Sequence, residues 1–508
     1  NECEVTGKTL AKERSELYHS FMKRAVSHKN GQAIHRILKK MPTTMSRPVS
    51  IGKMDTTEDQ HHADEQISIW AKVWHSNIDS ADHMNTLDWR KRSMDPTRAI
   101  SVYTSLDISD MELHRFREVI HAFKKNTSTS HDGIPSRIIN ELEDDTLRML
   151  IRFFKRSEAS GDWPVQWKDA VMIMIPKAEQ FKWRLIALLV TPYRIWARDA
   201  GRKVSAWTTG LKRDWIANGP KKSSEDVAYD IALYSEIAAG NLGQVSMVIM
   251  DDLEKGFEKV NHADLLAKAS IYDFPSAIAK LAIAMYRSPR RIRCGMAYSR
   301  ATRTNRGVLA GCPIAMGLLL LANLKPVDDF WANLPPRIRD NIVVFRVYVD
   351  DFIIAFRLDS NKLSADEMQM MVVGAYIRLS QAITVASANF ALGSGRVTAT
   401  DTELANKIKA ALNWCQCKTS DPTTCRCDTN HRVEARNNIT ILGVDYSAGR
   451  SVGYARNKER VAEAKSKASK IVSLCKGGLF ALNLIRTHVH ASAIYGTRVN
   501  GMSDKVLD

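Results

Sequence analysis

The sequence has few cysteines for its length and no long uninterrupted apolar segment. Eight cysteines among 508 residues do not suggest a disulfide-bonded scaffold, and a reduced, intracellular setting is the default expectation. The longest uncharged run, residues 307–324, approaches the length of a membrane span. Gly311, Pro313 and Gly317 interrupt this run, so we expect a loop that enters a buried helix, and no membrane association.

The chain also lacks an initiator methionine, an apolar leader, internal repeats and low-complexity tracts. It begins at Asn1, so we expect a piece of a longer polyprotein. The segments DAVMIMIPK and GQVSMVIMDD are typical of buried strands, whereas ADLLAKASIYDFPSAIAKLAIAMYRS predicts two helices with a break at Pro275. Strands mixed with helices, without a regular alternation, predict an α+β architecture.

Acidic residues are scarce relative to basic ones. The chain carries 73 lysines and arginines against 56 aspartates and glutamates, a formal charge of +17. Residues 287–306 contain seven arginines and no acidic residue. Because arginine suits planar, bidentate phosphate contacts, this distribution favours a nucleic-acid partner. A generic basic surface is the alternative, and composition alone leaves it open.

Two aspartate pairs interrupt apolar, β-branched segments. Asp350 and Asp351 lie in FRVYVDDFIIAF, and Asp251 and Asp252 end the run VIMDD. Burying carboxylates without partners is costly. Two adjacent strands would bring these groups close together, and a divalent cation such as Mg²⁺ would then neutralise them. The alternatives are a solvent-facing hairpin tip for the first pair and an acidic helix N-terminus for the second.

The two aspartate-bearing stretches, YVDDFIIAF and MDDLEKGFEKVNHADLL, resemble the metal-binding motifs of reverse transcriptases. Further stretches resemble other motifs of that family, in the expected order: SHDGIPSRIINEL, WPVQWKDAVMIMIPKAEQFKWRLIALLVTPYRIW, RGVLAGCPIAMG, ILGVDYS and SAIYGTRVNGMSD. Their order and spacing fit the enzymes of non-LTR (LINE-type) retrotransposons best. The resemblance covers the chain from about Asp107 to its end.

The resemblance implies a right-hand polymerase with an antiparallel palm sheet. Its expected parts are an N-terminal extension or connector (1–95), fingers (96–240), a palm (241–447) and the beginning of a thumb (448–508). The implied activity extends a DNA primer on an RNA template with dNTPs and two Mg²⁺ ions, for which Mn²⁺ can substitute. The family is expected in the nucleus and the cytoplasm.

The resemblance also assigns roles to individual residues. The implied catalytic and metal-binding groups are Asp252, chosen over Asp251, with Asp350, Asp351 and the backbone carbonyl of Leu253. The implied nucleotide-binding residues are Lys177 and Arg184 at the triphosphate, Phe257 against the sugar 2′ position, and Gly311. The implied template and primer contacts are Arg306, Tyr348, Leu442 and Gly443.

Some of these assignments have simpler structural alternatives. Phe257 could be a core aromatic, and Lys177 and Arg184 could be solvated charges at strand ends. The sequence also departs from the family pattern, since Ala310 stands where glutamine is usual and Cys312 where serine is common. One alternative function is therefore an inactive or repurposed copy that binds RNA. Another is a reverse transcriptase like that of group II intron maturases.

A cysteine cluster lies between the expected palm and the ILGVDYS stretch. It consists of Cys415, Cys417, Cys425 and Cys427. Because C-x-C pairs are less usual zinc ligands than C-x-x-C pairs, the spacing favours an exposed insertion with reduced cysteines. A structural zinc site is the alternative.

Overall fold

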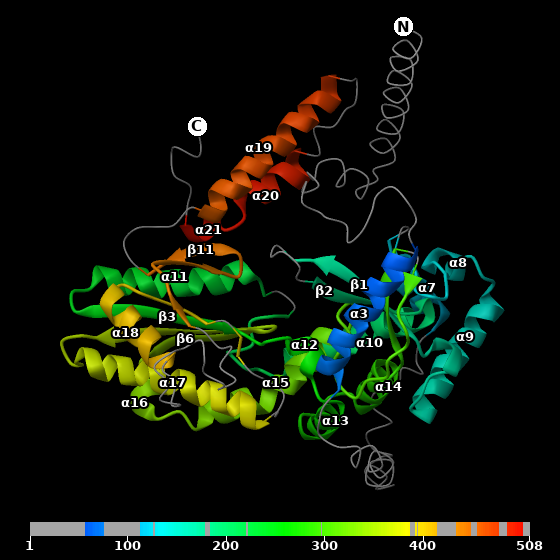
Figure 1. Ribbon diagram of the computed structural model, residues 1–508, viewed down its shortest axis with the longest axis horizontal. Helices are drawn as coiled ribbons and strands as arrows, with labels where there is room; N and C mark the ends of the chain where they lie inside the picture. The colour runs from blue at the N-terminus through cyan, green and yellow to red at the C-terminus, as the bar shows by residue number, and fades with distance from the viewer. Residues whose placement is uncertain are drawn as a thin grey trace.

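The computed structural model describes residues 56–75, 112–124, 127–177, 183–219, 222–295, 297–386, 392–393, 395–413, 433–448, 455–476 and 485–500. These residues form a mixed α+β structure with a five-stranded sheet, a four-stranded sheet and a two-stranded hairpin (Figure 1). The cysteine cluster at residues 415–427 lies outside the described residues. The predicted α+β class is therefore confirmed at this level.

The five-stranded sheet has the order β6 (Ile342–Tyr348), β7 (Asp351–Asp359), β3 (Gln244–Asp252), β8 (Arg396–Ala399) and β9 (Glu434–Ala435). β3 pairs antiparallel with both β7 and β8. Its alternate side chains face opposite sides of the sheet. Met247 and Ile249 enter the larger hydrophobic core, whereas Val248 and Met250 enter a smaller one. Burial on both faces explains why the sequence of β3 is a continuous apolar run.

Helices cover both faces of this sheet (Figure 1). α11 (Ser224–Gly240) packs on one face through Val227, Ala228 and Ile231. The other face carries α15 (Ala315–Ala332) and α17 (Ala365–Ala386), with α16 (Pro336–Arg339) and α18 (Thr402–Leu412) against α17. The uncharged run 307–324 therefore forms a loop and the buried start of α15, as predicted. None of the described helices combines the length and apolar character needed to cross a membrane.

The four-stranded sheet has the order β2 (Trp183–Leu188), β1 (Ala170–Pro176), β4 (Arg290–Cys294) and β5 (Ala297–Tyr298). β1 runs antiparallel to β2 and parallel to β4. The helices of this part are α7 (Leu113–His121), α8 (Ser136–Asn140), α9 (Asp144–Ser160), η2 (Val165–Trp167), α10 (Thr191–Gly210), α13 (His262–Ile271) and α14 (Ser276–Tyr286). The break between α13 and α14 contains Pro275, as predicted.

The helix α3 (Thr56–Trp74) lies against β4 and β5, although it belongs to the expected N-terminal extension (Figure 1). Ile67, Trp70 and Trp74 join the main hydrophobic core. The guanidinium carbon of Arg290 lies 4.8 Å from the ring centroid of Trp74. α3 is thus an integral part of the second sheet's packing.

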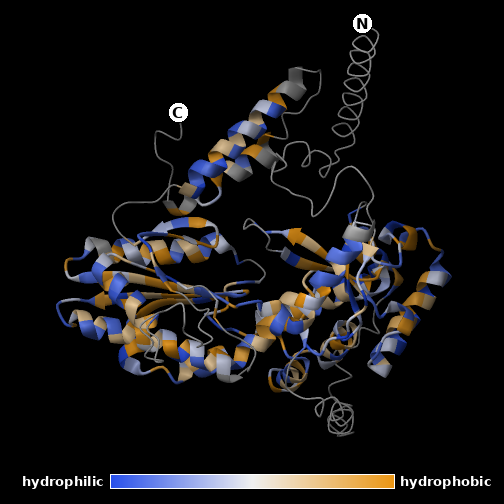
Figure 2. Cartoon of the chain, in the orientation of Figure 1, coloured by the Kyte–Doolittle hydropathy of each residue, from blue (hydrophilic) through white to orange (hydrophobic). Residues whose placement is uncertain are grey.

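The C-terminal part begins with a hairpin of β10 (Asn438–Ile441) and β11 (Val444–Ser447). It continues with α19 (Ala455–Lys476), η3 (Ile485–His490), α20 (Ala491–Ile494) and α21 (Thr497–Asn500). α19 projects away from the five-stranded sheet, and Figure 2 shows hydrophilic residues along much of its length. Ala464 and Ile471 are buried on its inner side, so one face of this polar helix is apolar.

Candidate functional site

Asp350 and Asp351 lie where β6 turns into β7, and this turn has an unusual backbone. β6 and β7 are joined by the two residues Val349 and Asp350, and Tyr348 pairs with Asp351. Val349 adopts a φ of +62°, a conformation that β-branched residues rarely occupy. Such strain costs about 1–3 kcal/mol and tends to occur at functional sites, so the turn is a candidate for function.

The two aspartate pairs meet across adjacent strands. Asp252 is the cross-strand partner of Asp351 in the register of β3 and β7. Directly opposed residues have Cβ atoms about 4.5–5.5 Å apart on the same face of the sheet. The amide of Leu253 also donates to the carbonyl oxygen of Asp350 at 2.9 Å. The fold therefore gathers Asp252, Asp350 and Asp351 at one end of the sheet.

Negative charge is crowded at this end. Burial raises the pKa of Asp350, and the charge of Asp252 raises it further. Burial raises the pKa of Asp351 to about 7, with further contributions from the charges of Asp350 and Asp252, while Arg396 opposes the shift. Carboxylates this close favour a bound cation or a shared proton.

Two cations of the four-stranded sheet face this charge. Lys177 follows β1 and Arg184 lies on β2, and both side chains are exposed. The charges of both residues lower the pKa of Asp350. The predicted triphosphate-binding cations thus belong to the four-stranded sheet, whereas the aspartates belong to the five-stranded sheet.

A short helix, α12 (Gly256–Lys259), follows the first aspartate pair. A Cβ on Gly256 would lie 3.0 Å from the Cβ of Leu253 and 3.8 Å from that of Asp350, so only a very small residue fits without displacement. Phe257 is half-buried against the main core, and its carbonyl accepts the amide of Val308 at 2.7 Å. Phe257 therefore lies next to the site and also packs in the core.

Gly311 lies in the loop before α15, where its backbone approaches β2. It adopts a φ of +104°, and a Cβ there would lie 2.9 Å from the carbonyl oxygen of Ala187. The amide of Ala187 in turn donates to the carbonyl of Ala310 at 2.7 Å. The close approach that the structure shows is to β2, and an approach to a nucleotide stays a prediction.

The arginine-rich stretch 287–306 is partly internal. Arg290 is 1% exposed, and its Nη2 donates to the carbonyls of Tyr286, Arg306 and Gly307 at 3.0–3.1 Å. Arg306 is 9% exposed and donates to the carbonyl of His75 at 2.5 Å. One guanidinium nitrogen of Arg306 is thus bonded to the protein backbone, and the template contact of Arg306 stays a prediction. Arg300 and Arg303 are the exposed members of the stretch.

A cavity of about 610 Å³ extends from Asp351 to the C-terminal hairpin. Asp351 lines it together with Leu442 and Gly443 at the β10–β11 turn. The other charged lining residues are four arginines and two glutamates: Arg396, Arg436, Arg456, Arg460, Glu459 and Glu463. Both turn residues have positive φ, +48° and +85°, as a two-residue type I′ turn requires. The predicted primer-binding turn therefore shares one cavity with a predicted catalytic residue. Tyr348 is half-buried beside the smaller core.

Tyr495 holds this turn in place, and sequence reasoning assigned it no role. Its hydroxyl donates to the carbonyl of Leu442 at 3.0 Å and lies 2.6 Å from the hydroxyl of Ser224 on α11. The guanidinium carbon of Arg460 lies 4.4 Å from its ring centroid. Tyr495 thus connects the turn, α11 and α19. The only sequence signal was its place in SAIYGTRVNG.

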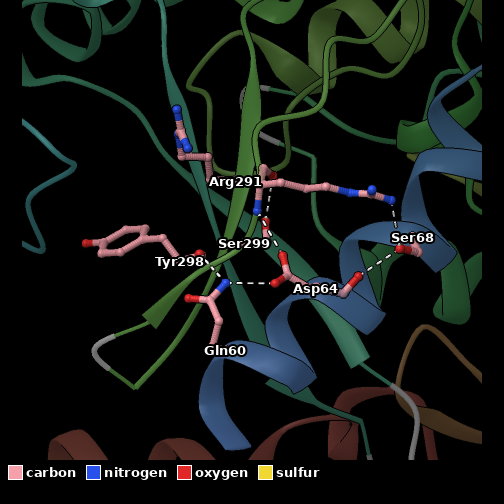
Figure 3. A pocket seen from close by; sticks show the side chains of 7 residues that line it. Gln60, Asp64, Ser68, Arg291, Tyr298 and Ser299 are labelled. Carbon is pink, nitrogen blue, oxygen red and sulfur yellow. Dashed lines mark hydrogen bonds between the residues drawn. The ribbon is translucent and has the colours of Figure 1, made fainter. Parts of the chain in front are cut away.

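A second cavity, of about 570 Å³, lies between α3 and β5 (Figure 3). Asp64 on its wall accepts the amide of Arg300 at 3.0 Å and the side chain of Gln60 at 2.8 Å. The guanidinium of Arg300 bonds Ser68 at 3.2 Å. Its polar groups therefore bind one another and fasten α3 to β5.

His262 supports the loop before α15, and its burial should make the stability of the fold depend on pH. It is fully buried, its Nε2 lies 3.1 Å from the carbonyl oxygen of Gly307, and burial lowers its pKa to about 3, with Arg287 and Arg290 contributing. The unfolded chain then binds one more proton here below about pH 6.5. We expect this residue's contribution to stability to be complete above that pH and to fall by about 1.4 kcal/mol per pH unit below it.

Urea unfolding of the wild type and of His262→Gln at about pH 7 and pH 5 tests this expectation. Glutamine can still donate to Gly307 but does not titrate in this range. The variant should lose less stability on acidification than the wild type. Equal losses in the two proteins would contradict the expectation.

The donor set at the aspartates suits Mg²⁺ chemically. Mg²⁺ in nucleotide sites is held by one or two carboxylates with substrate phosphates and water, and Asp252 and Asp350 can supply such carboxylates. Among the described residues, no group of three or more His, Cys, Asp or Glu side chains is arranged to hold a metal ion by itself. A metal ion here would therefore need oxygens from phosphate or water.

Part of the chain is similar to a transposon protein of Xenopus laevis. The relative is described as the transposon TX1 uncharacterized 149 kDa protein, and the two are 24% identical over 262 residues. The match covers 48% of this chain and 19% of the relative, so the chain spans about a fifth of that protein's length. No protein-family model matches the chain.

Proposed function

We propose that the chain is the RNA-directed DNA polymerase part of a LINE-type retrotransposon protein. The observation that carries the proposal is the pairing of Asp252 with Asp351 across β3 and β7, with Asp350 at the adjoining turn. The similarity to a transposon protein supports this class. A net charge of +17 suits a polyanionic template and primer.

In this proposal the five-stranded sheet is the palm of a right-hand polymerase. The four-stranded sheet, which carries Lys177 and Arg184, corresponds to the fingers, and α19 begins the thumb. Asp252 and Asp350 would hold Mg²⁺, with Asp351 beside them and the Leu253 carbonyl nearby. Bound Mg²⁺ would activate the primer 3′-hydroxyl and stabilise the charge of the reacting phosphate.

The protein's own side chains would position the reactants. Lys177 and Arg184 would bind the triphosphate of the incoming dNTP, because their positive charge already acts on Asp350. The arginine-lined cavity would receive the primer end next to Asp351, with the Leu442–Gly443 turn against its backbone. Positioning and electrostatics are the main contributions that proteins make to phosphoryl transfer.

Primer extension tests the proposal directly. Purified protein would be given an RNA template, an annealed DNA primer, dNTPs and Mg²⁺, and product length would be measured on a denaturing gel. We expect extension that requires both template and Mg²⁺. Tight binding of the hybrid without nucleotide addition, under conditions in which a related enzyme extends it, would favour an RNA-binding copy instead.

Phe257 is expected to make the site select deoxynucleotides over ribonucleotides. Its ring lies on α12, immediately after the small Gly256 that packs beside Asp350. Phe257→Val should relieve a steric block at the sugar 2′ position and raise the incorporation of ribonucleotides relative to deoxynucleotides by about tenfold or more, since about 1.4 kcal/mol of lost discrimination corresponds to tenfold. Single-nucleotide addition with a matched dNTP and rNTP measures this ratio.

A matched control is Phe123→Val, at another half-buried phenylalanine. Phe123 lies at the end of α7, where Arg198 packs over its ring at 4.9 Å from the centroid. This variant should keep the wild-type preference. If Phe257→Val keeps it as well, Phe257 is a core residue and the selection lies elsewhere.

A further inference from the structure

Asp251 precedes the proposed metal ligand but is directed away from it. Its side chain is 2% exposed, and neighbouring side chains of a pleated strand face opposite sides. One carboxyl oxygen accepts the backbone amide of Asp252 at 2.8 Å. The other accepts the hydroxyl of Tyr376, a 4% exposed residue on α17. A buried carboxyl group thus connects the backbone of Asp252 to a helix beneath the sheet.

Hydrogen bonds hold the backbone on both sides of the Asp252 side chain. Its carbonyl accepts the amide of Gly393 at 2.7 Å, and the next amide, of Leu253, donates to Asp350. The paired register of β3 and β8 ends at Met250, two residues before Asp252. The carboxyl group of Asp251 accepts the amide of Asp252, and such a partner matters because an unsatisfied buried amide is costly.

The pair is also tightly enclosed. A Cβ on Gly395 would lie 2.9 Å from the carboxyl oxygen of Asp251 that binds Tyr376, and 3.4 Å from the Tyr376 hydroxyl. Any side chain at position 395 would therefore disturb this hydrogen bond. The side chains of Asp251 and Tyr376 therefore have little room to change conformation. The Asp252 backbone, which is bonded to Asp251, is restricted with them.

We infer that the Tyr376–Asp251 hydrogen bond positions Asp252 and thereby sets the affinity of the site for divalent metal. The inference rests on the proposed function, because it takes Asp252 as a metal ligand. Groups that orient metal ligands typically change metal affinity by about 10–100-fold when they are removed. Tyr376 and Asp251 are positioning residues, since neither would touch the metal or the nucleotide.

Mn²⁺ binding, followed by electron paramagnetic resonance of the free ion, tests the inference without an activity assay. Tyr376→Phe removes one hydroxyl and leaves the ring in place. It should weaken Mn²⁺ binding by about tenfold. Asp251→Asn, which replaces one accepting oxygen with a donor, should weaken Mn²⁺ binding similarly. This variant tests the inference if Tyr376→Phe folds poorly.

The matched control is Tyr446→Phe. Tyr446 is 2% exposed, and its hydroxyl bonds Ser235, which in turn bonds Ser246 at the opposite end of β3. The control loses a comparable buried hydroxyl, so its thermal stability should fall by a similar amount while Mn²⁺ binding stays at the wild-type level. Equal weakening in the control would show a general structural effect and overturn the inference.

Asp252→Ala separates this inference from the proposed function. If the wild type binds Mn²⁺, Asp252→Ala does not, and both Tyr376→Phe and Asp251→Asn bind like the wild type, only the positioning role fails. If the wild type itself shows no Mn²⁺ binding that depends on Asp252, the metal site of the proposed function fails and the inference fails with it. In a protein that also extends primers, Tyr376→Phe should raise the Mg²⁺ concentration at half-maximal rate more than the KM for dNTP.

Discussion

Asp252→Asn should abolish primer extension and leave the fold intact. Asparagine keeps the shape of the side chain but loses the charge that would hold Mg²⁺ with Asp350. Metal stabilisation of charge in the transition state contributes several kcal/mol, and about 4 kcal/mol corresponds to about a 10³-fold loss of rate. Single-turnover addition of one dNTP to a primer on an RNA template measures the loss.

The fold should tolerate this change well. The charge of Asp252 raises the pKa of both Asp350 and Asp351, so removing it relieves repulsion, and we expect no loss of thermal stability. Asp359→Asn is the matched control, because Asp359 lies at the opposite end of β7 from Asp351 and pairs with Lys362 at 3.4 Å. Wild-type rates in the Asp252→Asn protein would refute the proposed function.

The strands that carry the aspartates could be predicted from the sequence, because local rules define them. β3 and β7 are continuous apolar, β-branched runs, and such runs have few alternatives in a chain of this composition. The break between α13 and α14 follows from Pro275. The pairing of β3 with β7 follows only from the resemblance, since no local rule specifies which two strands become neighbours.

The surroundings of the aspartates could not be predicted, because they depend on residues far apart in the chain. Tyr376 reaches Asp251 from α17, and Arg396 reaches Asp351 from β8. The preference for Asp252 over Asp251 came from alignment with a motif, whereas the structure gives a physical difference: Asp251 is enclosed by hydrogen bonds. Spacing in the sequence contains no information of this kind.

The arginine-rich stretch is only partly exposed, which composition could not show. Seven arginines in residues 287–306 suggested an exposed nucleic-acid surface, yet Arg290 and Arg306 are buried against backbone carbonyls. Their partners include Trp74 on α3 and His75 just after it, within the range that was expected to be an N-terminal extension or connector. Ile67, Trp70 and Trp74, spaced at three and four residues, were the available signal for a packed helix.

Trp74→Ala should therefore destabilise the protein strongly, although it lies in the expected extension. Trp74 is fully buried and stacks on Trp70 with ring centroids 6.0 Å apart, and the guanidinium of Arg290 lies over its ring. Replacing a buried tryptophan by alanine costs about 3–5 kcal/mol. Urea unfolding followed by far-ultraviolet circular dichroism measures the change, and hydrogen exchange of the β4 amides shows where it acts.

The same substitution should also loosen the loop before α15. Arg290 rests on Trp74 and binds the carbonyls of Arg306 and Gly307, and this loop continues to Gly311 beside β2. Ile69→Ala on α3 is the matched control, because Ile69 is 48% exposed and its truncation should change stability by no more than about 0.5 kcal/mol. If Trp74→Ala is no more destabilising than Ile69→Ala, α3 is a detachable extension, and Arg290 must be held by its carbonyl partners alone.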